Sequence, residues 1–107
     1  MRRGEVWTLR DDRFASEARP VVIVQADDAK FNSTVICLFT THDSSEIASR
    51  VHVLATDTNG LRRDSYVMTE KIAAVEPVEL GERIGALSIE QMAEVTAGMA
   101  RVLGISS

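Results

Sequence analysis

The stretch Arg19-Pro20-Val21-Val22-Ile23-Val24 decides the fold of this chain of 107 residues. Its four consecutive β-branched residues are stiff at χ1 and suit a buried, pleated surface, so they predict a core strand. Pro20 has no N–H for a sheet ladder, which places it at the start of that strand, and it holds Arg19 in an extended conformation. Arg19 would then stand at the strand mouth, where its guanidinium could meet a phosphate in a fixed geometry. The alternative is an ordinary surface arginine that enters a core strand.

Further strand patterns lie on both sides of this stretch. They cover residues 5–10, 34–40, 51–54 and 65–68, with 70–75 as an extension or a turn and 81–87 as a short strand or a turn. Asn59-Gly60 is a strong signal for a tight turn. The run at 34–40 is apolar throughout, which suits a strand covered on both faces or the centre of a small barrel.

A single helix is predicted at the C-terminal end. Ser88 with Gln91 three residues later has the spacing of a capping box, and Gly104 is placed to end the helix. The apolar stripe between them consists of Met92, Val95, Thr96, Met99, Val102 and Leu103. We therefore expect one mainly β domain over residues 1–107, a small antiparallel sheet or barrel of five or six strands closed by a C-terminal α-helix.

The charge is unevenly distributed. The net charge is −4 and the pI is about 5.1, which taken alone counts against binding of nucleic acid. Five arginines nevertheless fall within the first nineteen residues, namely Arg2, Arg3, Arg10, Arg13 and Arg19. They form either a local basic patch suited to a short single strand or a scattered, solvated set.

Several kinds of site are disfavoured. Cys37, the sole cysteine, lies inside an apolar strand pattern, where a buried and inert thiol is more typical than a nucleophile or metal ligand. The chain has no glycine-rich phosphate loop and no pair of histidines at metal spacing, so no cofactor or metal is expected. It also has no apolar segment long enough for a membrane span and no leader pattern, which predicts a cytoplasmic protein.

Polar groups collect after the third predicted strand. Thr40, Thr41, His42 and Asp43 bring hydroxyls, an imidazole and a carboxylate together, and His42 could act as an acid or base near neutral pH. His52 is expected on the polar face of a strand. Phe14, in the charged loop before Arg19, either folds back as a lid on the core or offers a ring on which a base can stack.

Four segments together resemble the MazF/PemK family of toxin endoribonucleases. They are Arg3-Gly4-Glu5-Val6-Trp7, Ser16-Glu17-Ala18-Arg19-Pro20-Val21-Val22-Ile23, Leu38-Phe39-Thr40-Thr41 and the run from Arg62 to Ile72. The resemblance spans essentially the whole chain in the same order. It implies an SH3-like small barrel of the MazF/CcdB toxin type and a homodimer. It also implies cleavage of single-stranded mRNA at short sequences without a metal, and inhibition by a cognate MazE-like antitoxin.

The resemblance also implies roles for individual residues. Arg19 and Thr40 match the family's catalytic pair, while Ser16 and Glu17 match flap positions that touch RNA, with Glu17 the nearest candidate base. We further expect contacts to RNA from Phe14, Thr41, His42 and Lys71. A guanidinium and a hydroxyl donor suit attack by the RNA's own 2′-OH, because both stabilise the charge that develops on the phosphorane oxygens. An acidic antitoxin tail would compete with RNA for the same groove.

The chain departs from some relatives in residues that read bases. Ala26 stands where some carry an asparagine, Lys71 where some carry a glutamine, and the loop from Leu9 to Ser16 lacks the usual proline and glycine. These differences concern the sequence that is cleaved, since contacts from variable loops decide which bases are read.

Two alternatives belong to other classes. CcdB-type toxins use the same barrel to bind DNA gyrase without catalysis, and an acidic pI suits such a role. Their contact lies at the end of the C-terminal helix, and here the segment Arg101–Ser107 carries no aromatic anchor of the kind that dominates binding hot spots. The other alternative is a structural dimer that has either lost its activity or depends on the antitoxin.

Overall fold

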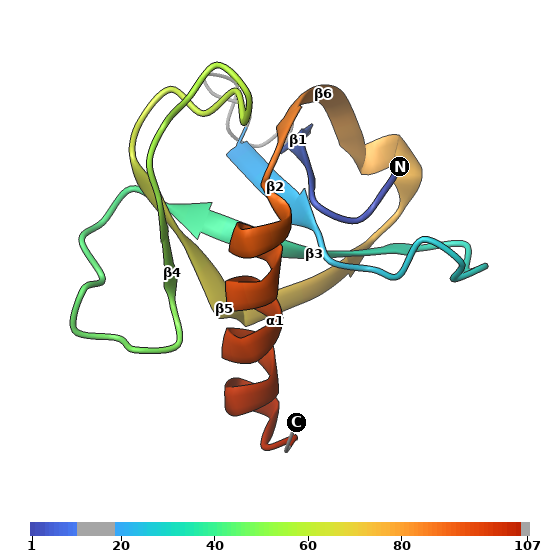
Figure 1. Cartoon of the computed structure of the whole chain (residues 1–107). Coiled ribbons are helices and arrows are strands. Elements are labelled where there is room, and N and C mark those ends of the chain that lie inside the picture. Colours follow the sequence, from blue (N-terminus) through green and yellow to red (C-terminus); the bar gives the residue numbers. More distant parts are fainter. Residues whose placement is uncertain (11–18, 106–107) are drawn as a thin grey trace.

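The computed structural model describes residues 1–10 and 19–105, and these form six strands, a short 3₁₀ helix and one α-helix (Figure 1). In chain order the elements are β1 (Glu5–Leu9), β2 (Arg19–Ile23), β3 (Thr34–Thr40), β4 (Val51–Val53), β5 (Ser65–Val75), η1 (Pro77–Glu79), β6 (Leu80–Ala86) and α1 (Ile89–Leu103). The prediction of a small antiparallel sheet with a C-terminal helix is confirmed. The two ambiguous segments are both strands, since residues 70–75 continue β5 and residues 81–87 largely form β6.

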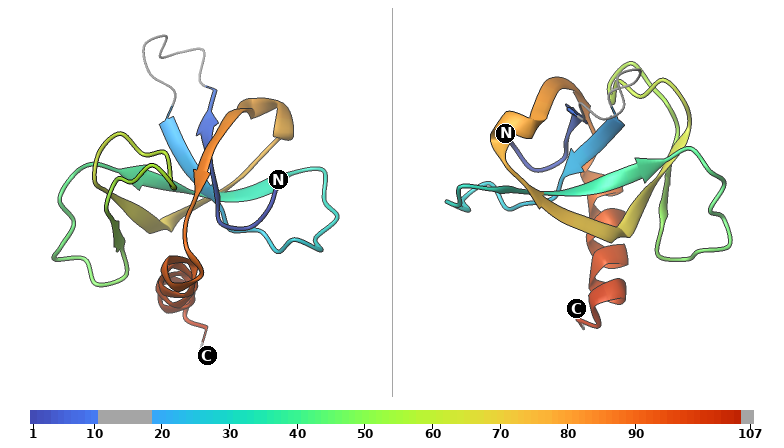
Figure 2. Two further views of the ribbon diagram at one scale, coloured as in Figure 1. Left: turned by 45° about the horizontal axis from the view of Figure 1, so that its top comes forward. Right: turned by 180° about the vertical axis from the view of Figure 1, so that it is seen from behind.

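The strands form one sheet in the order β4-β5-β3-β2-β1-β6, and all neighbours are antiparallel. The sheet curls strongly, and the loop after β4 reaches the far edge strand, where Ala86 N–H donates to the Thr58 carbonyl oxygen at 3.1 Å (Figure 2). Gly60 in this loop has φ +73, and a Cβ there would lie 2.0 Å from the Ile84 carbonyl oxygen. The predicted turn at Asn59-Gly60 thus brings the two sheet edges together as an SH3-like barrel.

Apolar side chains pack on both faces of the sheet. On the face covered by α1, buried residues of five strands, among them Val6, Val22, Cys37 and Val67, form one cluster with Met92 and Val95 of the helix. On the opposite face a smaller cluster contains Val21, Ile23, Ile36, Val75 and Leu80, with Trp7, Leu9 and Leu38 packed against it. β2 and β3 contribute to both clusters, which is why their sequences are apolar without alternation.

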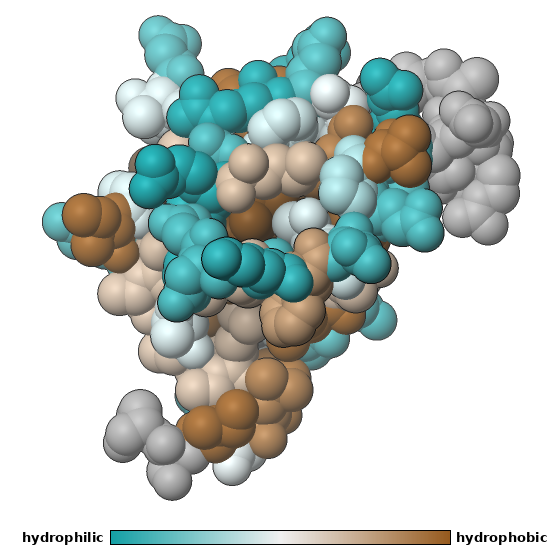
Figure 3. All heavy atoms as spheres, turned by 90° about the vertical axis from the view of Figure 1, so that its right-hand side faces the viewer, coloured by the Kyte–Doolittle hydropathy of each residue, from teal (hydrophilic) through white to brown (hydrophobic). Residues whose placement is uncertain are grey.

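The helix begins and ends as its sequence predicts. The Ser88 hydroxyl accepts from Gln91 N–H at 3.0 Å, the Gln91 side chain accepts from Ser88 N–H, and Gly104 takes the left-handed conformation at φ 71. The expected apolar stripe is correct in its first half, where Met92 and Val95 are buried. Its last turn extends beyond the sheet, so Val102, Leu103 and the following Ile105 stay exposed (Figure 3).

Candidate functional site

Arg19 and Thr40 lie at the same end of the two central strands. The ladder between β2 and β3 pairs Val21 with Leu38, and continuing this register by two residues puts Arg19 opposite Thr40. Both residues share the sheet face of Val21 and Leu38, because side chains alternate along a strand. The predicted catalytic pair is therefore brought together by strand register on the face opposite α1. Pro20 causes no loss in the ladder to β3, because that ladder begins only at Val21.

Two aromatic side chains continue this line across the sheet. Thr40 is paired with Tyr66 of β5, and Tyr66 is paired with His52 of β4. Directly paired residues of antiparallel strands point to the same face, so Arg19, Thr40, Tyr66 and His52 form what we call the polar row. The neighbouring row on this face, Trp7, Val21, Leu38 and Met68, is apolar.

The Thr40 hydroxyl is oriented by the backbone that follows it. His42 N–H donates to Thr40 Oγ1 at 3.1 Å. A hydroxyl has one proton to donate and can accept two hydrogen bonds, so accepting from His42 leaves its proton available for another acceptor. Thr40 is half-buried at the end of β3 and is thus placed to donate to an anionic oxygen.

An ion pair fixes the segment that carries Thr41, His42 and Asp43. Arg50 Nε lies 3.2 Å from both carboxylate oxygens of Glu70, its Nη2 also contacts Glu70, and its Nη1 donates to Ser44 Oγ at 2.9 Å. Ser44 is buried and donates to the His42 carbonyl oxygen at 3.0 Å. The Arg50 guanidinium lowers the pKa of Glu70, so both groups are charged at neutral pH.

The aromatic part of the polar row is also ordered by hydrogen bonds. Tyr66 OH donates to Asp43 Oδ1 at 3.2 Å, and the rings of His52 and Tyr66 stack with centroids 4.7 Å apart. The Ser45 backbone N–H also donates to Asp43 Oδ1, at 2.9 Å, and the hydrogen bonds from Ser45 and Tyr66 lower the pKa of Asp43. Partial desolvation and the Asp43 carboxylate raise the pKa of Tyr66, so its hydroxyl remains protonated at neutral pH.

The other predicted contacts to RNA fall in different places. Thr41 and His42 are exposed directly after β3, beside Thr40. Lys71 is exposed in the bulge of β5 between the paired residues Met68 and Ile72, outside the polar row. Phe14, Ser16 and Glu17 lie outside the described residues. Their assignment to RNA stays a prediction.

Of the two alternatives for the early arginines, a single basic patch does not include Arg2 and Arg3. The Arg3 guanidinium donates to the Val24 carbonyl oxygen and to Thr96 of α1, and Arg2 lies 3.9 Å from Asp27. These contacts are beyond the end of β2 that is distant from Arg19. Arg10, by contrast, follows Leu9, which is paired with Arg19. Because β1 runs antiparallel to β2, the residues before β1 lie at the Ile23 end of β2 and those after β1 lie at its Arg19 end. Arg2 and Arg3 are therefore separated from Arg10 and Arg19 although all four are close in the sequence.

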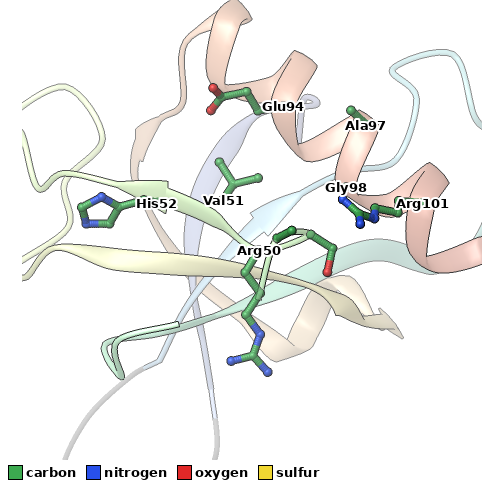
Figure 4. Close-up of a pocket in the computed structure, with 9 residues that line it drawn as sticks. Arg50, Val51, His52, Glu94, Ala97, Gly98 and Arg101 are labelled. Atoms are coloured by element: carbon green, nitrogen blue, oxygen red, sulfur yellow. The ribbon is translucent and has the colours of Figure 1, made fainter. Parts of the chain in front are cut away.

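Two hollows in the described part of the surface lie beside α1. One of about 440 Å³ separates α1 from residues 48–52, with Glu94, Gly98 and Arg101 on its helix wall (Figure 4). In that view Val51 points toward the helix, whereas the His52 ring and the Arg50 guanidinium point away from it. Neither this hollow nor the one of about 410 Å³ beside Arg3 and Ser88 includes Arg19 or Thr40. Of the polar row, His52 lines the first of these two hollows.

Other chemistries have no matching geometry in residues 1–10 and 19–105. Cys37 is fully buried, and burial raises the pKa of its thiol to about 11, which argues against a nucleophilic role. No three histidine, cysteine or acidic side chains in this part of the chain gather as metal ligands. None of its helices is long and apolar enough to cross a membrane.

Sequence reasoning did not single out the pairing of Tyr66 with Thr40 and His52. The signal was present in the alternation Ser65, Tyr66, Val67, in which Tyr66 is the outward-facing residue of a strand. Which strands neighbour it, and in what register, is a tertiary property that the local pattern does not contain.

The chain thus has the class of fold in which a strongly curled antiparallel sheet is covered by one C-terminal helix, here with an arginine and a threonine at the same end of its two central strands. Residues 2–103 match the family model described as PemK-like, MazF-like toxin of type II toxin-antitoxin system. The chain is 32% identical over 109 residues to a probable endoribonuclease MazF of Mycolicibacterium smegmatis, with 99% of each chain covered. It is also 32% identical over 93 residues to endoribonuclease MazF6 of Mycobacterium tuberculosis, with 84% of this chain and 82% of that protein covered. The chain therefore belongs to the PemK-like, MazF-like toxin family.

Solved structures share the fold. An endoribonuclease in complex with its cognate antitoxin, from a mycobacterial species, superposes with a TM-score of 0.81 at 23% identity, covering 100% of this chain and 98% of that one. The toxin MazF-mt6 of M. tuberculosis gives 0.81 at 21% identity, covering 96% and 99%. MazF from Deinococcus radiodurans gives 0.77 at 15% identity, covering 98% and 97%. The expected MazF-type barrel is thus confirmed.

Proposed function

We propose that this toxin is a metal-independent endoribonuclease that cleaves single-stranded RNA and thereby inhibits translation and growth. The observation that supports it most directly is the convergence of Arg19 and Thr40 at the end of β2 and β3, with the Thr40 hydroxyl proton left available by the bond from His42. The names of the two curated relatives, both endoribonucleases, point to the same reaction.

The proposed reaction uses the RNA's own 2′-OH. The 2′-oxygen loses its proton to a base and attacks the adjacent phosphorus, the bond from phosphorus to the 5′-oxygen breaks, and the leaving oxygen takes up a proton. The products are a 2′,3′-cyclic phosphate and a 5′-OH end. Arg19 neutralises the charge that grows on the phosphorane oxygens, and Thr40 donates a hydrogen bond to one of them. A guanidinium is effectively always protonated in proteins, so the part of Arg19 is electrostatic.

Two groups are candidates for the proton transfers. Glu17 precedes Arg19 by two residues in the sequence and is the proposed base. His42 follows Thr40 by two residues and is exposed, and an imidazole can serve as a general acid or a general base. A pH–rate profile of Glu17→Gln and His42→Gln separates these two roles.

The proposal extends to the setting in which the toxin acts. All 107 residues act as a single domain, in a cytoplasmic homodimer that a cognate antitoxin inhibits. An acidic antitoxin tail would occupy the surface of Arg19 and exclude RNA by charge. Raising the salt concentration should then weaken the complex, whereas an affinity independent of salt would count against this mode of inhibition.

The test is incubation of purified protein, in EDTA, with a long RNA of little structure, followed by mapping of 5′ ends. Wild type should cut at one recurring short sequence and leave 5′-OH ends that a polynucleotide kinase labels without prior phosphatase treatment. Arg19→Ala and Thr40→Ala should lose cleavage while circular dichroism shows intact folding. Arg101→Ala, on α1 and away from the polar row, is the control for loss of a surface cation.

One result would favour a non-enzymatic toxin over an endoribonuclease. If wild type leaves RNA intact and still arrests growth on expression, the endoribonuclease proposal fails. Retained toxicity of Arg19→Ala would then agree with a CcdB-like toxin that binds gyrase, and pull-down with gyrase becomes the next experiment.

A further inference from the structure

We propose that Tyr66 and His52 form a stacking platform for the base of a nucleotide that flanks the scissile phosphate. The inference rests on the proposed function, because it adds a substrate subsite to the same sheet face. It assigns a positioning role to two residues that lie beside Thr40 in space and far from it in the sequence.

The register of the sheet places the platform next to the reacting bond. Tyr66 is directly opposite Thr40 on the neighbouring strand, and His52 is directly opposite Tyr66 one strand further. Adjacent strands lie about 4.8 Å apart, so Tyr66 is one strand spacing from Thr40. A base stacked on Tyr66 therefore belongs to a nucleotide adjoining a phosphate held by Thr40 and Arg19.

The two rings are arranged for stacking. Their centroids are 4.7 Å apart and their planes differ by 24°. The separation matches one strand spacing, so the stack runs across the strands, along the polar row. Because His52 comes from β4, it stacks on the side of Tyr66 that is turned toward β4, and the opposite side of the ring is turned toward β3, the strand of Thr40. A planar base placed against that side of the Tyr66 ring would form a stack of three rings with Tyr66 and His52.

The Tyr66 ring is also held in position. Its hydroxyl donates to Asp43, and Asp43 in turn accepts from Ser45 N–H, within the segment that Arg50 fixes to Glu70. The ring is half-buried, whereas His52 is exposed. A ring that is ordered before binding loses little conformational freedom when a base stacks on it, which favours affinity. Unstacked bases of single-stranded RNA are commonly held on aromatic side chains in this way.

The first experiment measures binding of an RNA that cannot be cleaved. It uses a short single strand containing the cleavage sequence, with a 2′-O-methyl group that removes the nucleophile at the cut site. Tyr66→Ala should weaken binding by about 10- to 100-fold, the range expected for loss of one stacked base. Tyr66→Phe keeps the ring and should stay within about threefold of wild type, and His52→Ala should fall between them.

A matched control comes from another exposed aromatic residue. Phe31 is 72% exposed in the connection between β2 and β3, at the end of the sheet opposite Arg19 and Thr40. Phe31→Ala removes as large an aromatic surface and should leave RNA binding unchanged. Gel filtration and thermal denaturation of each variant verify its assembly and folding, and Tyr66→Leu tests the loss of the ring with less loss of volume than alanine.

The decisive measurement pairs each variant with RNAs that carry one abasic nucleotide. If the platform holds one base, a single abasic position next to the cleaved bond should weaken wild type and leave Tyr66→Ala unaffected, while all other positions act independently of the variant. Independent effects at every position would overturn the inference, as would binding by Tyr66→Ala equal to that of wild type. Equal losses in Tyr66→Phe and Tyr66→Ala would also overturn it in favour of a hydroxyl contact. Absence of binding by wild type would overturn the proposed function as well.

Discussion

The ion pair between Arg50 and Glu70 should stabilise the fold in a way that depends on pH. The Arg50 side chain is 15% exposed and that of Glu70 31%, so the pair is more buried than ordinary surface pairs, which contribute about 0.2–1 kcal/mol. It is less buried than pairs whose disruption costs about 3–5 kcal/mol. We expect Glu70→Gln to lower the free energy of unfolding by about 1–3 kcal/mol, because it leaves Arg50 with the neutral Ser44 hydroxyl and a neutral amide.

The sign of the pH dependence follows from the lowered pKa of Glu70. A carboxyl group whose pKa is depressed in the folded state contributes its full stabilisation above its ordinary pKa of 4.5 and loses it as the pH falls through the folded value. In thermal denaturation, the melting temperature of Glu70→Gln should therefore lie below that of wild type at pH 7, and this difference should disappear as the pH drops below 4.5. For a domain of this size the gap at pH 7 corresponds to about 4–8 °C per kcal/mol.

A matched variant isolates the pair from the general effect of removing a carboxylate. Glu82 is exposed on β6, and Glu82→Gln should leave the melting temperature within about 1 °C of wild type at either pH, since exposed substitutions seldom exceed about 0.5 kcal/mol. All proteins are compared at one concentration, because dimerisation would shift the melting temperature. The reasoning is refuted if Glu70→Gln melts with wild type at pH 7, or if the gap persists unchanged at pH 3.

Three further outcomes test other parts of the molecule. Thr40→Val keeps the shape of the side chain and removes its hydroxyl, so RNA cleavage should fall about 10²–10³-fold while Thr40→Ser retains most activity; a valine variant within threefold of wild type contradicts the assigned role. Gly98→Ala should destabilise the protein by about 1–3 kcal/mol, measured by urea denaturation, despite the better helix propensity of alanine, because its Cβ would lie 2.4 Å from the Ser49 carbonyl oxygen. Cys37 should resist iodoacetamide at pH 8 until the protein is unfolded, because burial raises its pKa to about 11; rapid alkylation of the native protein would show that the thiol is accessible.

Most of the fold could be predicted from local patterns. Three segments predict their own conformation, because their steric and hydrogen-bonding preferences act within a few residues. They are the β-branched run after Arg19, the Asn59-Gly60 turn and the capping box at Ser88. The end of the helical stripe was not predictable in the same way. Val102 and Leu103 continue the apolar period, but burial requires a sheet beneath them, and α1 extends past its edge.

The residues of the candidate site could likewise be predicted from local motifs, whereas their grouping in space could not. Arg19 and Thr40 were recognisable from their motifs, each at the end of a strand pattern. The sequence left open whether the early arginines form one patch, and the structure separates Arg2 and Arg3 from Arg19, because they are bound near Asp27 and Thr96 at the far end of β2. Proximity in the sequence does not fix proximity in a sheet whose strands run in opposite directions.

The sequence by itself determined the elements, the cap, the inert thiol and the family, because these depend on side chains within one short segment or on motifs in order. Only the tertiary structure decided that Arg19, Thr40, Tyr66 and His52 share one row. That row is set by strand order and register, and these depend on which apolar faces are buried together. A shift of one residue in the pairing register of β3 would turn Thr40 toward α1 and separate it from the other residues of the row, although every local sequence pattern would be unchanged.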